Sequence, residues 1–81
     1  MPRLYIHLHD GDGWLYDAEG RDLGDTSTVA ALVLSEARAM IAADVMAGLP
    51  VQAGSFVAAD NSEGVEVARV SFGEAFSVVG L

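Results

Sequence analysis

The chain contains no cysteine and no lysine, and only two prolines stand among its 81 residues. Without cysteine, disulfide bonds and thiolate metal sites are excluded, and the usual disulfide framework of a small secreted protein is missing. This favours a reducing compartment, so we expect a cytoplasmic protein. A chain of this length fits one domain, residues 1–81, whose small core gives limited stability.

Long uninterrupted apolar runs are also missing. The longest stretch of low charge, residues 26–43, contains Ser35, Glu36 and Arg38 near its middle. A membrane span needs about 20 predominantly apolar residues. Residues 1–9 alternate between polar and apolar side chains, unlike the continuous apolar segment of a signal peptide. We therefore expect neither a membrane span nor an export signal.

Positive charge is scarce, because the chain has four arginines and twelve acidic residues, which gives a net charge of −8. Nucleic acids and anionic membranes bind through cationic side chains, so both are excluded as expected partners. Half of the acids lie close together: Asp10, Asp12, Asp17, Glu19, Asp22 and Asp25. We interpret this stretch as solvated loops, and a basic protein partner or a cation is the alternative.

The first part of the chain predicts a β-hairpin. Leu4, Ile6 and Leu8 recur at every second position, so residues 3–9 are expected to form a half-buried strand. Glycine and aspartate at positions 10–13 favour a turn, which returns the chain as a short strand at 14–16. A further turn is expected at 17–20.

A long helix is predicted for residues 26–47. Asp25, Thr26, Ser27 and Thr28 are candidate N-caps, and Gly48 and Pro50 follow the expected end. Helical spacing predicts one face against the sheet, made of Val29, Ala30, Val33, Leu34, Ala37, Met40, Ile41 and Val45. The opposite face carries Leu32, Ala39, Ala43 and Met46 and has little charge, which favours a second subunit that covers it. The alternative is that these are scattered exposed apolar residues without a partner.

A second hairpin is predicted from strands at 55–59 and 65–71. Residues 72–76 are expected either as a short helical turn or as an irregular segment, in both cases delivering Phe72 and Phe76 to the core. Residues 77–81 are a tail or an edge strand. The predicted fold class is α+β: a small antiparallel sheet of two hairpins, in the order ββαββ, with one long helix on one face.

Several motifs resemble a family of small bacterial proteins, frequent in alphaproteobacteria. Its members open with Met-Pro-Arg-Tyr-Phe-Phe-His-Leu or close variants, and this chain opens with Met-Pro-Arg-Leu-Tyr-Ile-His-Leu. Four later features also match the family: Asp-Gly at 10–11, the segment 17–23, the alanine-rich helix with its stop at 48–50, and the loop 60–64. The family is a domain of unknown function, so the resemblance implies no activity, ligand or active site. Leu4 and Tyr5 depart from its usual aromatic pattern.

A more distant likeness is to HicB-type antitoxin domains, which place a hairpin before an alanine-rich helix and then return to the sheet. This likeness concerns the layout and not a motif. It implies at most a role in binding another protein.

The most specific chemical hypothesis is that His7 and His9 bind a metal ion. Two residues apart on a strand, both rings project from the same face, and imidazoles at this spacing can share a divalent transition metal with Asp10 as third ligand. The motif matches no complete metal loop, however, and a role in surface or subunit contact is favoured. Residues 10–13 also lack the later oxygen ligands of a calcium loop, so we interpret them as a turn.

Asp44 lies within the apolar arc of the predicted helix, so its carboxylate is expected to be partly desolvated. We expect it either to pair with an arginine, Arg3 or Arg69, or to reach out past the end of the sheet, and a carboxylate tuned for proton transfer is the alternative. No nucleophile can be placed beside a base, and no cofactor or catalytic residue is predicted.

We therefore predict a non-catalytic protein-interaction domain that forms a homodimer. The candidate contact surfaces are the outer helix face, with Leu32, Ala39, Ala43 and Met46, and the sheet face that carries Tyr5, His7 and His9. The alternative is a protein that binds a metal or small ligand through His7 and His9.

Overall fold

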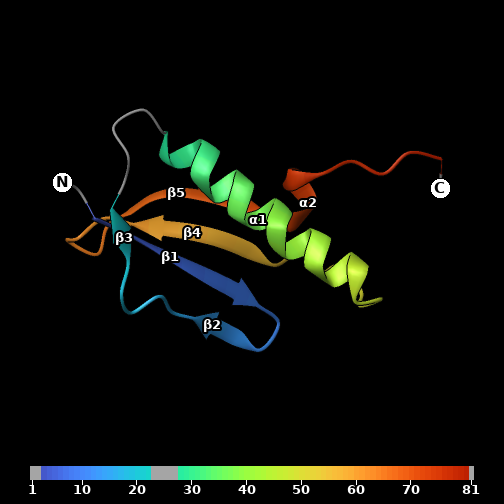
Figure 1. Ribbon diagram of the computed structural model, residues 1–81, viewed down its shortest axis with the longest axis horizontal. Helices are drawn as coiled ribbons and strands as arrows, with labels where there is room; N and C mark the ends of the chain where they lie inside the picture. Colours follow the sequence, from blue (N-terminus) through green and yellow to red (C-terminus); the bar gives the residue numbers. More distant parts are fainter. Residues whose placement is uncertain (1–2, 23–27, 81) are drawn as a thin grey trace.

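The computed structural model describes residues 3–22 and 28–80 of the chain. The elements follow the order β1 (Arg3–Asp10), β2 (Gly13–Leu15), β3 (Arg21–Asp22), α1 (Val29–Met46), β4 (Phe56–Asp60), β5 (Glu66–Ser71) and α2 (Phe72–Ala75). Figure 1 shows one layer of sheet with α1 lying across one of its faces. The α+β class is confirmed, and paired strands lie where both hairpins were predicted, but the ββαββ order and the two-hairpin layout are not exactly matched, because β3 and α2 are added.

The third strand, β3, was not predicted. It pairs with the start of β1, where Arg3 lies opposite Asp22 and their side chains form an ion pair of 3.3 Å. Nε of Arg3 also donates to the main-chain oxygen of Glu19 at 2.8 Å. Gly20 permits this arrangement: its φ is +70°, and a Cβ there would lie 2.8 Å from the Leu4 oxygen. Tertiary pairing thus makes a strand from two residues with no strand pattern of their own.

Strand order in the sheet is β2-β1-β4-β5, with every pair antiparallel. The two hairpins therefore join through β1 and β4, which pair from Tyr5 opposite Asp60 to His9 opposite Phe56. Because side chains alternate along a strand, Ile6 belongs to the face beneath α1, and its neighbours Tyr5 and His7 belong to the open face.

The main helix begins after its N-cap, Thr28, whose Oγ1 accepts a hydrogen bond from the N–H of Ala31 at 3.1 Å. The other candidate caps, at 25–27, lie outside the described residues. The last helical residue is Met46, one position before the predicted end. No helix in residues 3–22 and 28–80 is long and apolar enough to cross a membrane.

One face of α1 covers the sheet. Its buried residues are Val33, Ala37 and Ile41, which recur every four positions and pack on Ile6 and Val57. This confirms the centre of the predicted apolar face.

Three positions on α1 were assigned to the wrong face. Ala30 and Val45 are exposed, although both were expected against the sheet. The reason for Val45 is that the C-terminal end of α1 extends beyond the strands (Figure 1). Leu32 was placed on the outer face, but it is half-buried and packs against the core.

The end of the chain forms a short helical turn, α2. Ser71 caps it: its Oγ accepts from the Glu74 N–H at 3.2 Å, and the Glu74 carboxylate accepts from the Ser71 N–H at 3.2 Å. The turn buries Phe72 and Ala75. Phe76 was also expected in the core, but it follows the last helical residue and is exposed. Residues 76–80 form neither helix nor strand.

A matched pair of valines on α1 tests this packing. Val33 is 2% exposed and Val45 is 62% exposed. Val33→Ala is expected to lower the free energy of unfolding by about 2 kcal/mol, because it leaves a cavity against the sheet. Val45→Ala should change it by less than about 0.5 kcal/mol. Urea unfolding of both variants measures the difference, and equal losses would contradict the assigned helix face.

Candidate functional site

Five rings gather on the sheet face that α1 does not cover, and we call this cluster the aromatic platform: His7, His9, Trp14, Tyr16 and Phe56. Trp14 stacks on Tyr16 with ring centroids 5.6 Å apart, and His9 stacks on Phe56 at 4.7 Å. Edge-to-face contacts join the two stacks, with Trp14 5.3 Å from Phe56. The rings therefore hold one another in fixed orientations.

Strand register explains why these rings meet. His9 lies opposite Trp14 on β2 and opposite Phe56 on β4. One more residue, Arg69 on β5, places its guanidinium 3.9 Å above the Phe56 ring. Its Nη2 also donates to Glu66 at 2.7 Å. The platform thus ends in a cation that is already paired with a carboxylate.

His7 forms the buried edge of the platform. The main-chain N–H of Asp17 donates to its Nδ1 at 2.9 Å, so Nδ1 carries no proton in this arrangement. Its Nε2 lies 3.3 Å from the Asp60 carboxylate. A shallow depression of about 200 Å³ borders His7, Tyr5 and Asp60. Nδ1 is thus hydrogen-bonded to the main chain, and Nε2 faces a carboxylate.

Asp17 organises the turn beside the platform. Its carboxylate accepts hydrogen bonds from the main-chain N–H groups of Gly20 at 3.0 Å, Ile6 at 3.2 Å and Glu19 at 3.2 Å. Hydrogen bonds from Gly20 and Ile6, which favour the charged form, hold the pKa of Asp17 below its ordinary value of 3.8. This carboxylate is therefore a structural group.

The structure does not bring the predicted metal ligands together. His7 and His9 share one face of β1 as expected, but Asp10 lines a pocket on the helix side of the strand. In the ranges 3–22 and 28–80, no three side chains of His, Asp or Glu are grouped so that they could hold a metal ion.

The predicted contact residues are scattered. Ala39, Ala43 and Met46 are exposed on α1, whereas Tyr5 is half-buried on the sheet face. The Tyr5 ring lies against Gly20, since a Cβ added there would fall 2.8 Å from it. With Leu32 packed on the core, the outer helix face offers mainly small side chains.

Much of the acidic stretch has local structural partners. Oδ1 of Asp10 accepts from the Asp12 N–H at 2.8 Å, Asp17 organises its turn, and Asp22 pairs with Arg3. Asp10 and Asp22 end strands β1 and β3, so only part of the stretch forms loops as predicted. Asp25 lies outside the described residues.

Asp44 does not pair with either predicted arginine. Arg3 binds Asp22, and Arg69 binds Glu66. Asp44 is half-buried and lines the same pocket as Asp10. Its partial burial agrees with the prediction, but the expected ion pair is absent, because Arg3 pairs with Asp22 across two strands and Arg69 pairs with Glu66 on its own strand, β5.

Comparison with known families adds one finding to this geometry. A family described as Domain of unknown function (DUF6894) matches residues 3–73. The chain belongs to this family. The matched region of the DUF6894 domain includes the whole aromatic platform and the pocket beside Asp44. No curated protein and no solved structure matches the chain.

Sequence reasoning missed most of the platform, namely Trp14, Tyr16, Phe56 and Arg69. Trp14 and Tyr16 alternate with Leu15, which was an available signal for a shared face. Phe56 and Arg69 could not be found in this way, because their position beside His9 depends on pairing between β1 and β4.

The role of Asp17 predicts a pH-dependent loss of stability. Asp17→Ala removes three main-chain hydrogen bonds and is expected to lower the free energy of unfolding by about 2 kcal/mol at pH 7. Because the folded pKa is depressed, this contribution is present above pH 3.8 and is lost as the pH falls through the folded pKa. The difference between wild type and variant, measured by urea unfolding, should therefore shrink in acid.

Asp12→Ala is the control, because Asp12 is exposed in the neighbouring turn. It should cost little at any pH. If Asp12→Ala and Asp17→Ala gave the same loss and the same pH dependence, the role of Asp17 would be contradicted.

Proposed function

We propose that this protein is a non-catalytic interaction domain that self-associates through the aromatic platform. The observation that carries the proposal is the cluster of mutually stacked rings on a sheet face without a covering element among the described residues. Trp, Tyr and Arg are the residues that most often dominate binding energy at protein interfaces. Because the platform rings already hold one another, binding would cost little side-chain entropy.

The platform is a surface where a second copy could bind without bringing many acidic side chains together. Two chains of charge −8 repel each other, so their contact must avoid the acidic surface. At the platform, Glu66 is paired with Arg69, and Asp60 lies beside His7. The charge of Glu66 at this surface is therefore balanced by Arg69. In a twofold dimer the same patch would serve on both subunits, so each Arg69 and Glu66 pair could face its copy.

The layout shared with HicB-type antitoxin domains is consistent with a protein-binding role. A surface on the outer side of α1, with Ala39, Ala43 and Met46, is the alternative contact. We favour the platform because large aromatic side chains contribute more to association than the alanines of the helix face. Substitutions of Tyr16 on the platform and of Met46 on α1 separate the two surfaces.

The competing proposal is a metal-binding protein that uses His7, His9 and Asp10. It is less well supported, because an ion at Nδ1 of His7 would displace the Asp17 N–H, and residues 3–22 and 28–80 hold no group of three His, Asp or Glu side chains around a common point. Asp10 would also have to reach the ion from the other side of β1. Titration with zinc, followed by calorimetry and by the melting temperature, should give no response if the platform is a protein contact.

Leu15, the last residue of β2, and Tyr16, which follows it, provide a matched test of self-association. Tyr16 is 66% exposed and belongs to the platform, while Leu15 is 69% exposed and belongs to the opposite face. Light scattering after size exclusion, over a range of concentrations, should show a dimer for wild type and for Leu15→Ala. Tyr16→Ala should weaken the dimer by at least about tenfold.

Three outcomes would contradict the proposal. Wild type could remain a monomer at every concentration, or Tyr16→Ala and Leu15→Ala could behave alike. Alternatively, Met46→Ser could dissociate the dimer while Tyr16→Ala leaves it intact, which would place the contact on the outer face of α1.

A further inference from the structure

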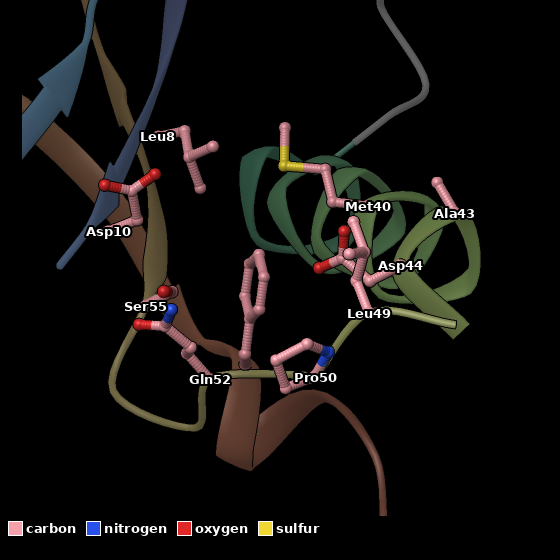
Figure 2. Close-up of a pocket in the computed structure, with 10 residues that line it drawn as sticks. Leu8, Asp10, Met40, Ala43, Asp44, Leu49, Pro50, Gln52 and Ser55 are labelled. Atoms are coloured by element: carbon pink, nitrogen blue, oxygen red, sulfur yellow. The ribbon is translucent and has the colours of Figure 1, made fainter. Parts of the chain in front are cut away.

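A second concave site lies on the other side of the sheet. The pocket has a volume of about 460 Å³ and lies between the end of β1, the C-terminal half of α1 and the segment 49–55. Figure 2 shows Asp10, Gln52 and Ser55 on the strand side of the pocket and Asp44 on the helix side. Its size falls within the range of about 300–1,000 Å³ that is typical of small-molecule sites.

Local sequence builds the helix side of this pocket. Met40 and Asp44 are four residues apart on α1, so they face the same way. The helix then ends in a Schellman motif, in which Gly48 has φ +72°. In this motif the Leu49 N–H donates to the main-chain oxygen of Asp44 at 2.9 Å. This turn brings Leu49 and Pro50 into the pocket wall.

The pocket has a polar group at each side and apolar walls between. Leu8 and Met40 supply apolar surface, and Phe72 adds a buried ring. Carboxylates are contributed from the two sides by Asp10 and Asp44. A ligand that matches this pattern has two cationic ends and an apolar middle.

No arginine neutralises these carboxylates. Arg3, Arg21 and Arg69 form ion pairs with Asp22, Glu36 and Glu66, and Nε of Arg38 donates to the main-chain oxygen of Ala75. The chain has no lysine. The last turn of α1 also carries no basic residue, so the negative end of the helix dipole adds to the charge of Asp44.

Ser55 is an independent indication of a ligand. It is only 5% exposed, yet it lines the pocket. Within the described part of the chain, the Ser55 hydroxyl forms no side-chain hydrogen bond. It is not fully enclosed either, because every fully enclosed polar side-chain atom in that part has a hydrogen-bond partner. The Ser55 hydroxyl is therefore open to the pocket and available to a bound polar group.

We propose that this pocket binds a small organic dication, two ammonium groups joined by an apolar chain. One ammonium lies by Asp10 and Ser55, and the other lies by Asp44. The chain between them packs on Leu8 and Met40. Because the pocket is on the opposite side of the sheet from the aromatic platform, this site is independent of self-association.

Calorimetric titration of the full chain at low ionic strength tests the proposal. The probes are α,ω-diaminoalkanes from diaminopropane to diaminooctane, compared with the diol and the monoamine of the best length. We expect an optimum chain length, weaker binding of the monoamine and no binding of the diol. Asp10→Asn and Asp44→Asn should each weaken the best diamine about tenfold, and Ser55→Ala should weaken it less.

Asp12→Asn is the matched control, because it removes one charge from the same acidic stretch without lining the pocket. It should leave the affinity unchanged, and the melting temperature of each variant checks folding. The proposal is overturned if no diamine binds, if the monoamine binds as tightly as the diamine, or if Asp12→Asn weakens binding as much as Asp44→Asn.

Discussion

The pairing of β1 with β4 is the constraint on which the rest of the structure depends. It joins the two hairpins into one sheet, and it places Ile6 opposite Ala59 and His9 opposite Phe56. Since successive side chains point to opposite faces, this single register creates the buried layer under α1 and the aromatic platform on the other side. A shift of one residue would exchange the two sets and remove both the core and the platform.

Scarcity of positive charge shapes both surfaces. With four arginines and no lysine, each cation has a specific place: three form ion pairs and Arg38 ties α1 to α2. At the platform, Arg69 and Glu66 balance each other beside Phe56. At the pocket, Asp10 and Asp44 have no arginine partner. One surface is thereby suited to a like copy and the other to a cation.

Local patterns in the sequence predicted the fold class, both hairpins and the main helix, because alternation, turn residues and caps are short-range signals. They did not predict β3, which owes its structure to pairing with Arg3, or the exposure of Val45, which depends on where the sheet ends. The candidate site was predicted only at His7 and His9. Phe56, Arg69 and the pocket at Asp44 depend on contacts between segments far apart in the chain.

The central claim is that β1 separates two independent binding faces, and amide and indole chemical shifts test it most directly. Dilution of the protein should shift the signals of Trp14, Tyr16 and Phe56 and leave those of Asp10, Asp44 and Ser55 in place. A diamine should do the reverse. If both treatments shifted the same set of residues, the two faces would not be independent and the account would be contradicted.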